Sequence, residues 1–168
     1  DLNIRLVVQP HAGPATARNR GVSEASGTFI AFTDDDCRPA ADWLTKLKLR
    51  LDADPEAVIA GSTVNILTDN SYSVASQMLI DYLNAYYNTE NARFLTSNNM
   101  ALARDVFVKA GGFDTSFPLA AAEDREFCDR CMHLGMKTVF APEAVFHIPD
   151  LFGDRMHGGL RIRLRGAA

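Results

Sequence analysis

The sequence predicts an α/β domain with a mainly parallel sheet and helices on its faces. Strand-like and helix-like segments alternate along the chain, as they do in proteins of this class. Residues 28–33 (TFIAFT) form an almost continuous apolar run, which is typical of a strand buried on both faces in a parallel sheet. The chain has 168 residues, of which 47% are hydrophobic and 23% charged, so its size and composition suit one globular domain.

In the first half of the chain, turn-forming residues separate the predicted helices and strands. We expect a strand at 3–9, a helix at 15–26, a strand at 28–33, a helix at 42–51 and a strand at 57–67. Pro14 suits the first turn of a helix and Gly27 its end. Trp43, Leu47 and Leu51 recur at helical spacing, which predicts a helix with one apolar side.

The second half continues the alternation. We expect a helix at 72–87, a strand interrupted by a loop at 94–103, helices at 104–110 and 123–134, and short strands at 137–140 and 145–148. Gly111 and Gly135 would end the two later helices. Residues 1–149 then form the domain, and residues 150–168 form a basic tail that carries four arginines.

Composition excludes several classes of protein. The formal net charge is -4, so the basic footprint of a nucleic-acid-binding protein is missing. No apolar run approaches the ~20 residues that span a bilayer. The chain has 3 cysteines, an odd number that favours a reducing compartment over a disulfide framework. Cys128 and Cys131 have no second pair at zinc-ligand spacing, so we expect them to pack on a buried helix face.

Three consecutive carboxylates provide the first chemical signal. Asp34, Asp35 and Asp36 directly follow the apolar strand, and ligands of open α/β sheets bind at such strand ends. Hard oxygen ligands suit Mg²⁺ or Mn²⁺. An exposed acidic turn or a helix cap is the alternative interpretation.

Three weaker signals lie elsewhere. Glu123 and Asp124 begin a helix, where they could act in catalysis or simply complement the helix dipole. His147 lies in an apolar strand, where it could be a metal ligand or a structural residue. Arg18 lies near a helix start that could approach a phosphate, and the alternative is an exposed arginine on an ordinary amphipathic helix.

Taken in order, these signals resemble the family-2 glycosyltransferases with the GT-A nucleotide-sugar fold. The matching stretches are residues 13–44 (GPATARNRGVSEASGTFIAFTDDDCRPAADWL), 97–117 (SNNMALARDVFVKAGGFDTSF), 123–135 (EDREFCDRCMHLG) and 139–149 (VFAPEAVFHIP). The resemblance covers residues 3 to about 149. The order of a DxD sequence, GGFD, ED and PEAVFH makes it specific.

The resemblance implies a role for each candidate residue. Asp34 and Asp35 would face the nucleotide, while Asp36, Asp34 and His147 would hold Mg²⁺ or Mn²⁺ on the sugar diphosphate. Asp124 would be the general base, with Glu123 beside it. The residues implied for the nucleotide pocket and the two sugars are Arg18, Asn19, Ser97, Asn98 and Asn99. Arg130 is expected to anchor its helix by pairing with a nearby carboxylate.

The resemblance also implies a reaction and its partners. It implies inverting transfer of a sugar from a nucleotide-sugar to a sugar, lipid-linked or protein acceptor, in cell-envelope glycan synthesis. The QxxRW motif of processive synthases is missing, which favours a single transfer. A nucleotidyltransferase on a similar fold is disfavoured by GGFD and EDREFCDR. We expect the cytoplasm as the location, with the inner face of the membrane as the alternative.

Two further expectations concern the completeness of the catalytic domain and an apolar helix. The strand–helix–strand unit with which family members normally begin is not found here, so the chain is expected to be a truncated catalytic domain. A noncatalytic module that binds metal or sugar is therefore the alternative function. Residues 73–88 (SVASQMLIDYLNAYYN) are apolar and aromatic, and predict either a helix packed on the sheet or one facing a partner or membrane.

Overall fold

A computed structural model describes residues 4–89, 91–117 and 122–148 of the chain. The basic tail expected at 150–168 lies outside these residues. The strands are β1 (Phe29–Thr33), β2 (Arg38–Pro39), β3 (Val58–Asn65), β4 (Asn99–Ala103) and β5 (Thr138–Ile148). The helices are α1 (Gly13–Glu24), α2 (Trp43–Ala53), α3 (Ser71–Tyr87), α4 (Arg104–Ala110) and α5 (Glu123–His133).

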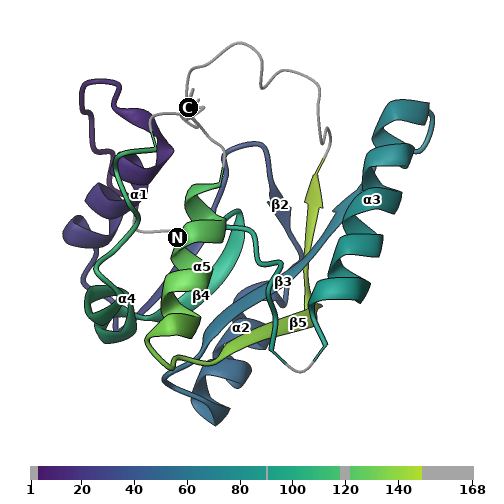
Figure 1. The fold of residues 1–168 in the computed structure, drawn as a ribbon. Coiled ribbons are helices and arrows are strands. Elements are labelled where there is room, and N and C mark those ends of the chain that lie inside the picture. The colour runs from purple at the N-terminus through teal and green to yellow at the C-terminus, as the bar shows by residue number, and fades with distance from the viewer. Residues whose placement is uncertain (1–3, 90, 118–121, 149–168) are drawn as a thin grey trace.

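The described strands form one mixed sheet in the order β1-β4-β3-β5-β2 (Figure 1). β3 and β5 pair in parallel, whereas β1–β4, β3–β4 and β2–β5 pair antiparallel. The α/β class is confirmed, but the expectation of a mainly parallel sheet is corrected. β1, β3 and β5 run in the same direction, and β4 enters between β1 and β3 in the opposite one.

The sheet has one apolar core on each face, which gives three layers. On one face, α1, α4 and α5 pack against Ile30, Val58 and Met100. There, the rings of Phe107 and Phe113 contact each other and both contact Phe32 and Phe127. On the other face, Trp43, Leu47 and Leu51 of α2 pack against Ile59 and Phe146.

β1 is buried on one face only. Ile30 and Phe32 point into the core, while Phe29 is 37% exposed. The expectation that this strand is buried on both faces is therefore wrong for the described residues. The physical reason is its place at the edge of the sheet: the α2-side core contains no residue of β1.

The two expected final strands are one strand, β5, with a bulge. Ala141 pairs with Gly61, and Val145 pairs with the next residue, Ser62, so residues 142–144 bulge out of the ladder. Before the bulge, Val139 and Ala141 pack on the α2 side; Ala144, the last residue of the bulge, and Phe146 after it pack on the same side. The bulge thus reverses the alternation of side chains along β5.

Most other expected elements are confirmed within a few residues. Helix α4 has the expected bounds, and Cys128 and Cys131 are buried in the core on α5. Residues 4–9, expected as a strand, have no regular secondary structure. The two-residue strand β2 was not expected, because Arg38 and Pro39 carry no strand pattern.

Helix α3 is the helix least buried against the rest of the described chain. Ser73 is its only buried residue, and Gln77 joins it to β3 by bonding the backbone N–H of Asn65 and the carbonyl of Thr63, at 2.7 and 2.9 Å. Of the two predicted alternatives, α3 therefore shows the packing on the sheet, and its hydrogen bonds to β3 are made by the polar side chain of Gln77. Within the described residues, no helix is both long and apolar enough to cross a bilayer.

Candidate active site

Arg18 connects two of the acidic segments singled out in the sequence. It projects from α1, donates to Glu123 Oε1 at 2.8 Å and to Asp34 Oδ1 at 3.1 Å, and its guanidinium lies 5.7 Å from the centre of the Phe113 ring. The side chain of Arg18 is 15% exposed and that of Glu123 is 5% exposed. The arginine therefore neutralises a buried carboxylate and ties the acidic loop after β1 to the start of α5.

Asp124 is the candidate base, and α5 places it beside the turn before β4. Its Oδ2 accepts from the backbone N–H of Ser97 at 3.3 Å, and its Oδ1 accepts from the N–H of Arg125 at 2.8 Å. Burial raises the pKa of the Asp124 carboxyl, and the charge of Glu123 raises that pKa further against the lowering effect of the Ser97 hydrogen bond. A carboxylate with a raised pKa is a stronger base, as general base catalysis requires.

The backbone at the start of α5 is unusual. Ala122 has φ 70°, the left-handed region that residues other than glycine seldom adopt. Glu123 follows it directly and lies inside the protein, 4% exposed. Such backbone strain is often found near functional sites.

The residues of the turn before β4 have different environments. Ser97 is 3% exposed and supplies the N–H that holds Asp124. Asn98 is partly exposed, and its Oδ1 accepts from the Thr96 hydroxyl at 2.8 Å. Of the three residues expected near the sugars, Asn98 therefore has the most accessible side chain.

Asn99 is fully buried and has a structural environment. Its Nδ2 donates to the carbonyls of Ser62 and Ala144, both at 2.9 Å, and its Oδ1 accepts from Trp43 Nε1 at 2.8 Å. This differs from the expected contact with a sugar, because all the surface of the amide is occupied by protein groups. The amide instead joins α2, β3 and the bulge of β5.

Asn19 also serves the fold through its amide. Its Nδ2 donates to the carbonyl of Phe113 at 2.8 Å, and its Oδ1 accepts from the N–H of Phe113 at 2.9 Å. These two bonds fix the turn after Gly111 and Gly112, both of which have positive φ. The expected role of Asn19 in lining a nucleotide pocket would have to use the rest of its side chain.

The acidic loop and His147 meet at one corner of the sheet. β2 pairs Arg38 with His147, and Arg38 lies two residues after Asp36. Because the bulge reverses the alternation, His147 faces away from the α2 side, where Phe146 lies. Asp34, Asp36 and His147 therefore have donor types that suit Mg²⁺ or Mn²⁺, and the topology brings their segments together. No group of three metal-binding side chains is already assembled among the described residues.

The thiol of Cys37 adjoins this loop. Its Sγ lies 3.5 Å from Asp36 Oδ1. Burial and the charges of Asp36 and Asp34 raise the pKa of Cys37 to about 12, so it is a neutral thiol at physiological pH.

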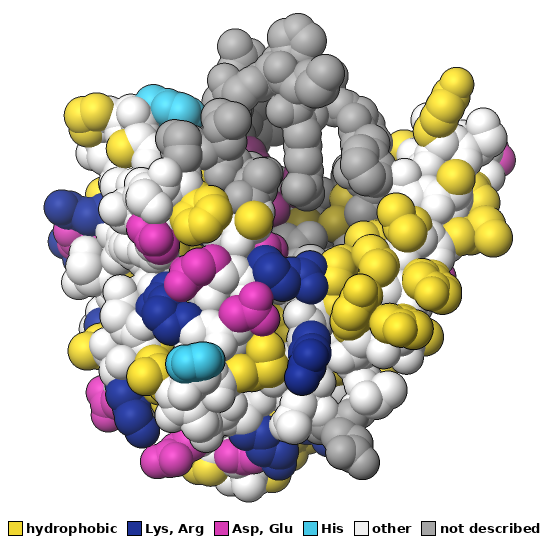
Figure 2. All heavy atoms as spheres, viewed as in Figure 1, with side chains coloured by type: hydrophobic (Ala, Val, Ile, Leu, Met, Phe, Trp, Pro, Cys, Tyr) yellow, Lys and Arg dark blue, Asp and Glu magenta, His cyan; other side chains and the backbone are white. Residues whose placement is uncertain are grey.

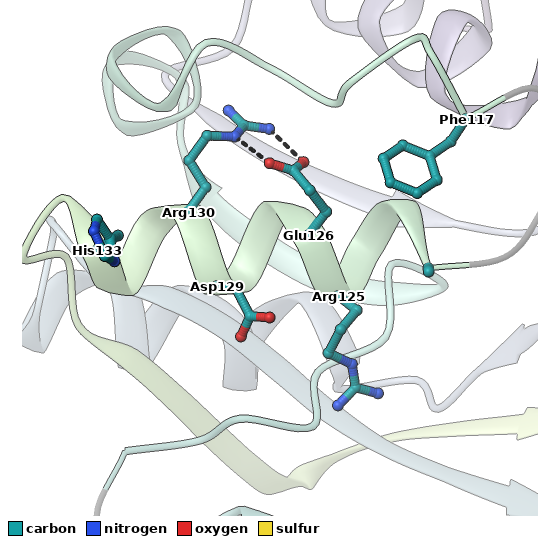
Figure 3. Close-up of a pocket in the computed structure, with 7 residues that line it drawn as sticks. Phe117, Arg125, Glu126, Asp129, Arg130 and His133 are labelled. Carbon is teal, nitrogen blue, oxygen red and sulfur yellow. Dashed lines mark hydrogen bonds and ion pairs between the residues drawn. The ribbon is translucent and has the colours of Figure 1, made fainter.

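A shallow cavity of about 510 Å³ lies along the outer side of α5 (Figure 3). Arg130 forms part of its wall, pairs with Glu126 through two bonds of 2.6 and 2.8 Å, and donates to the carbonyls of Ala110 and Gly112. The expected anchoring role of Arg130 is thus confirmed. Asp124 does not line this cavity, so the cavity is separate from the candidate base.

Two structural partners of the site were not identified from the sequence. Trp43 holds Asn99, and Gly61 allows the bulge of β5 to approach, because a Cβ at Gly61 would lie 1.9 Å from the Ala144 carbonyl oxygen. A glycine within a strand is a sequence signal for such close approach. The hydrogen bond of Trp43 has no comparable signal.

Several known proteins are similar to this chain. A pre-mycofactocin glycosyltransferase of Mycobacterium tuberculosis is 26% identical over 151 residues, which cover 85% of this chain and 32% of that protein. Glycosyltransferase AglE of Haloferax volcanii is 23% identical over 94% of this chain and 51% of its own length. A glucosyl-dolichyl phosphate glucuronosyltransferase of the same organism is 26% identical over 62% of this chain and 35% of that protein. The chain thus spans about a third to a half of these relatives.

Solved structures share the fold. GalNAc-T7, crystallised with UDP, GalNAc and Mn²⁺, superposes with a TM-score of 0.62 at 14% identity, over 82% of this chain and 30% of its own. The mannosyltransferase PcManGT of Pyrobaculum calidifontis, in complex with GDP-Man and Mn²⁺, gives 0.59 at 21% identity, over 84% and 38%. These similarities confirm the GT-A fold. The glycosyl transferase family 2 model matches residues 1–111, and the chain therefore belongs to glycosyltransferase family 2.

Proposed function

We propose that this chain provides catalytic residues for metal-assisted sugar transfer from a nucleotide-sugar to an acceptor hydroxyl, with inversion at the anomeric carbon. The observation that carries the proposal is the ion-pair network of Glu123, Arg18 and Asp34, which ties the acidic loop after β1 to the residue beside Asp124. Asp124 itself has a raised pKa, to which the charge of Glu123 contributes. Proteins of the same fold bind UDP or GDP-Man together with Mn²⁺, which supports the same donor class here.

Asp124 would take the proton from the acceptor hydroxyl as that oxygen attacks the anomeric carbon. Its Oδ2 is held by the Ser97 N–H, which orients the carboxylate and leaves its second lone pair for the incoming proton. Attack from the side opposite the leaving diphosphate gives inversion. Arg18 would hold Glu123 and Asp34 in place while the acceptor enters.

The metal would be held by Asp34, Asp36 and His147, with Asp35 facing the nucleotide. When bound, Mg²⁺ or Mn²⁺ supplies positive charge that stabilises the departing diphosphate. The role of the chain is to supply hard oxygen and imidazole donors from two segments that β2 and β5 pair at one sheet corner.

The test is release of nucleoside diphosphate from UDP- and GDP-sugars with Mn²⁺. Asp124→Asn should abolish transfer and leave donor binding intact, since Asn keeps the shape of the side chain but cannot accept the proton. Unchanged turnover in Asp124→Asn would refute the base. His147→Ala should weaken Mn²⁺ binding, and an unaltered Mn²⁺ affinity would remove His147 from the metal site.

The alternative function is a module that binds metal or sugar without transferring it. Calorimetry with UDP-sugars, GDP-sugars and Mn²⁺ separates the two functions. Binding with no diphosphate release over hours favours the module, whereas release that depends on Asp124 favours the enzyme.

A further inference from the structure

Arg125, which directly follows the candidate base on α5, contacts the loop between α3 and β4. Its Nη1 donates to the Arg93 carbonyl at 3.0 Å, and its guanidinium lies 4.5 Å from the centre of the Phe94 ring. Figure 3 shows that Arg125 projects from α5 on the side opposite Arg130. The contact to the loop is therefore separate from the ion pair that anchors the helix.

The contact of Arg125 with the loop lies at the surface. Arg125 is partly exposed and belongs to neither apolar core. In Figure 2, dark blue side chains lie on the surface between α5 and the hydrophobic side chains over α3. Replacing this arginine therefore leaves no hole in a core, and its effects can be separated from a loss of packing.

The loop that Arg125 contacts also supplies the hydrogen bond to the candidate base. We call residues 88–98 the α3–β4 loop, and the structure describes all of them except residue 90. The side-chain amide of Asn88 bonds the N–H and the carbonyl of Phe94, at 2.7 and 2.8 Å. Leu95 is 1% exposed in the core on the α1 side, and Ser97 is 3% exposed. Because this short segment is bonded and packed, a displacement of Phe94 is passed on to Ser97.

Helix α5 holds the α3–β4 loop through two consecutive residues. Asp124 Oδ2 accepts from the Ser97 N–H at 3.3 Å, while Arg125 holds Phe94 three residues earlier. Neighbouring side chains on a helix point in different directions, so these two contacts reach separate parts of the loop. The Ser97 bond is longer than the usual range of about 2.7–3.2 Å for an N–H···O bond. A small shift of the loop would therefore break it.

Arg125 also affects the charge of Asp124. Burial raises the pKa of Asp124, and the charge of Glu123 adds to this, whereas the Ser97 hydrogen bond and the charge of Arg125 lower it. Loss of Arg125 would raise this pKa in two ways, because a positive charge is removed and the Ser97 N–H is loosened. The titratable and charged groups near the carboxyl are Glu123, Arg125 and Cys128 on α5, with Arg18 of α1 paired to Glu123.

From this arrangement we propose that Arg125 is a positioning residue for Asp124: by holding Phe94 it keeps the Ser97 N–H on the Asp124 carboxylate. The assignment rests on the proposed function only in naming Asp124 as the base. The contacts on which it depends belong to the chain itself, so they can be measured without donor, acceptor or metal.

The experiment is a pH titration of the 168-residue chain followed by nuclear magnetic resonance. The carboxyl carbon of Asp124 reports its pKa, and the amide proton of Ser97 reports the hydrogen bond between them. In the unmodified chain, the Ser97 amide proton should shift as Asp124 ionises. In Arg125→Gln, this shift should fall by at least half, and the midpoint of the Asp124 titration should move to higher pH.

Two further variants separate the contact from the charge. Phe94→Leu keeps the charge of Arg125 and removes the ring, so it should also weaken the Ser97 response. Arg125→Lys keeps a positive charge but loses the planar guanidinium. It should weaken the Ser97 response as Arg125→Gln does, with an Asp124 midpoint closer to that of the unmodified chain.

Arg20→Gln on α1 is the matched control. It removes the same charge from a side chain whose partner, Glu24, lies on its own helix. Both resonance signals should therefore titrate as in the unmodified chain.

Turnover gives a second measurement. Arg125→Gln should lower kcat about 10- to 100-fold, as expected for a misplaced reacting group, and leave the KM of the donor unchanged. The acidic limb of the kcat profile should move to higher pH with the Asp124 midpoint. A merely structural role would lower the urea midpoint of unfolding and leave the pH profile in place.

Three outcomes overturn the positioning role. They are an unchanged Ser97 response in Arg125→Gln, a higher Asp124 midpoint with an unchanged Ser97 response, and equal effects of Arg125→Gln and Arg20→Gln. If Arg125→Gln does not fold, Phe94→Leu decides, and an unchanged Ser97 response in that variant equally overturns the proposal.

The positioning role and the proposed function can fail separately. Transfer that persists in Asp124→Asn, together with a weakened Ser97 response in Arg125→Gln, would contradict the base and leave the positioning of its carboxylate intact. Transfer that depends on Asp124, with unchanged resonance signals in Arg125→Gln, would do the reverse.

Discussion

Replacing Arg18 by glutamine should destabilise the protein strongly. The change leaves the Glu123 carboxylate, whose side chain is 5% exposed, without its cation, and also removes the hydrogen bond to Asp34. Removing one partner of a buried ion pair costs about 3–5 kcal/mol, because the other charge stays buried and unpaired. At about 2–4 °C per kcal/mol for a domain of this size, the melting temperature should fall by about 6–20 °C.

The same helix provides a matched control. Arg20 pairs with Glu24 on α1, but these side chains are 54% and 22% exposed. Arg20→Gln should therefore cost only about 0.3–0.5 kcal/mol. Both variants can be measured by urea unfolding followed by circular dichroism and by the fluorescence of the single tryptophan, Trp43.

A second substitution tests the cause. Arg18→Gln/Glu123→Gln removes both charges, so it should recover at least half of the lost free energy of unfolding. Equal costs for Arg18→Gln and Arg20→Gln would refute the argument from burial. A double variant no more stable than Arg18→Gln would show that the unpaired charge is not the cause.

Three further predictions concern the base, the bulge and the thiols. Because the pKa of Asp124 is raised in the folded protein, protonation of this carboxyl favours the folded state. This contribution to the free energy of unfolding is fully present below pH ~3.9, the ordinary pKa of Asp, and is lost as the pH rises through the raised pKa. Asp124→Asn should thus be at least as stable as the unmodified chain at pH 7, and kcat should fall as pH drops through the raised pKa; a flat kcat profile would contradict the role. Gly61→Ala should cost about 3 kcal/mol in urea unfolding because its Cβ would meet the Ala144 carbonyl oxygen, whereas Gly21→Ala, with open space around its Cβ, should stabilise α1 by about 0.5–1 kcal/mol. Burial raises the pKa of Cys128 and Cys131, the latter to about 11, so both should resist iodoacetamide in the native protein at pH 7, and rapid alkylation would contradict their burial.

The helices, the strands and the candidate site residues could be predicted from the sequence better than the groups that each of them contacts. α4 and the start of α5 follow from local signals, a glycine pair and an acidic first turn, and both were predicted. The direction of β4 depends on which strands it pairs with, and no local pattern encodes that choice. The short strand β2 is formed only because β5 lies beside it.

In the candidate site, too, the residues could be predicted from the sequence but their contacts could not. The acidic loop, Asp124 and Arg18 were singled out by type and order, but the sequence did not show that Arg18 joins Asp34 to Glu123. Asn99 was assigned to the sugars because of its motif, and its burial depends on Trp43 from α2 and Ala144 from β5. Those contacts join segments 56 and 45 residues away in the chain, which a local pattern does not specify.

The bulge in β5 has a consequence for how this part of the protein tolerates changes in length. Because three residues stand between the pairs Ala141–Gly61 and Val145–Ser62, the bulge decides which of Phe146 and His147 enters the α2-side core. An insertion or deletion of one residue would exchange the two, placing an imidazole in the core and a phenyl ring at the metal corner. A change of two residues would keep both side chains on their present faces. Length variation at this point should therefore be acceptable in even steps and damaging in odd ones.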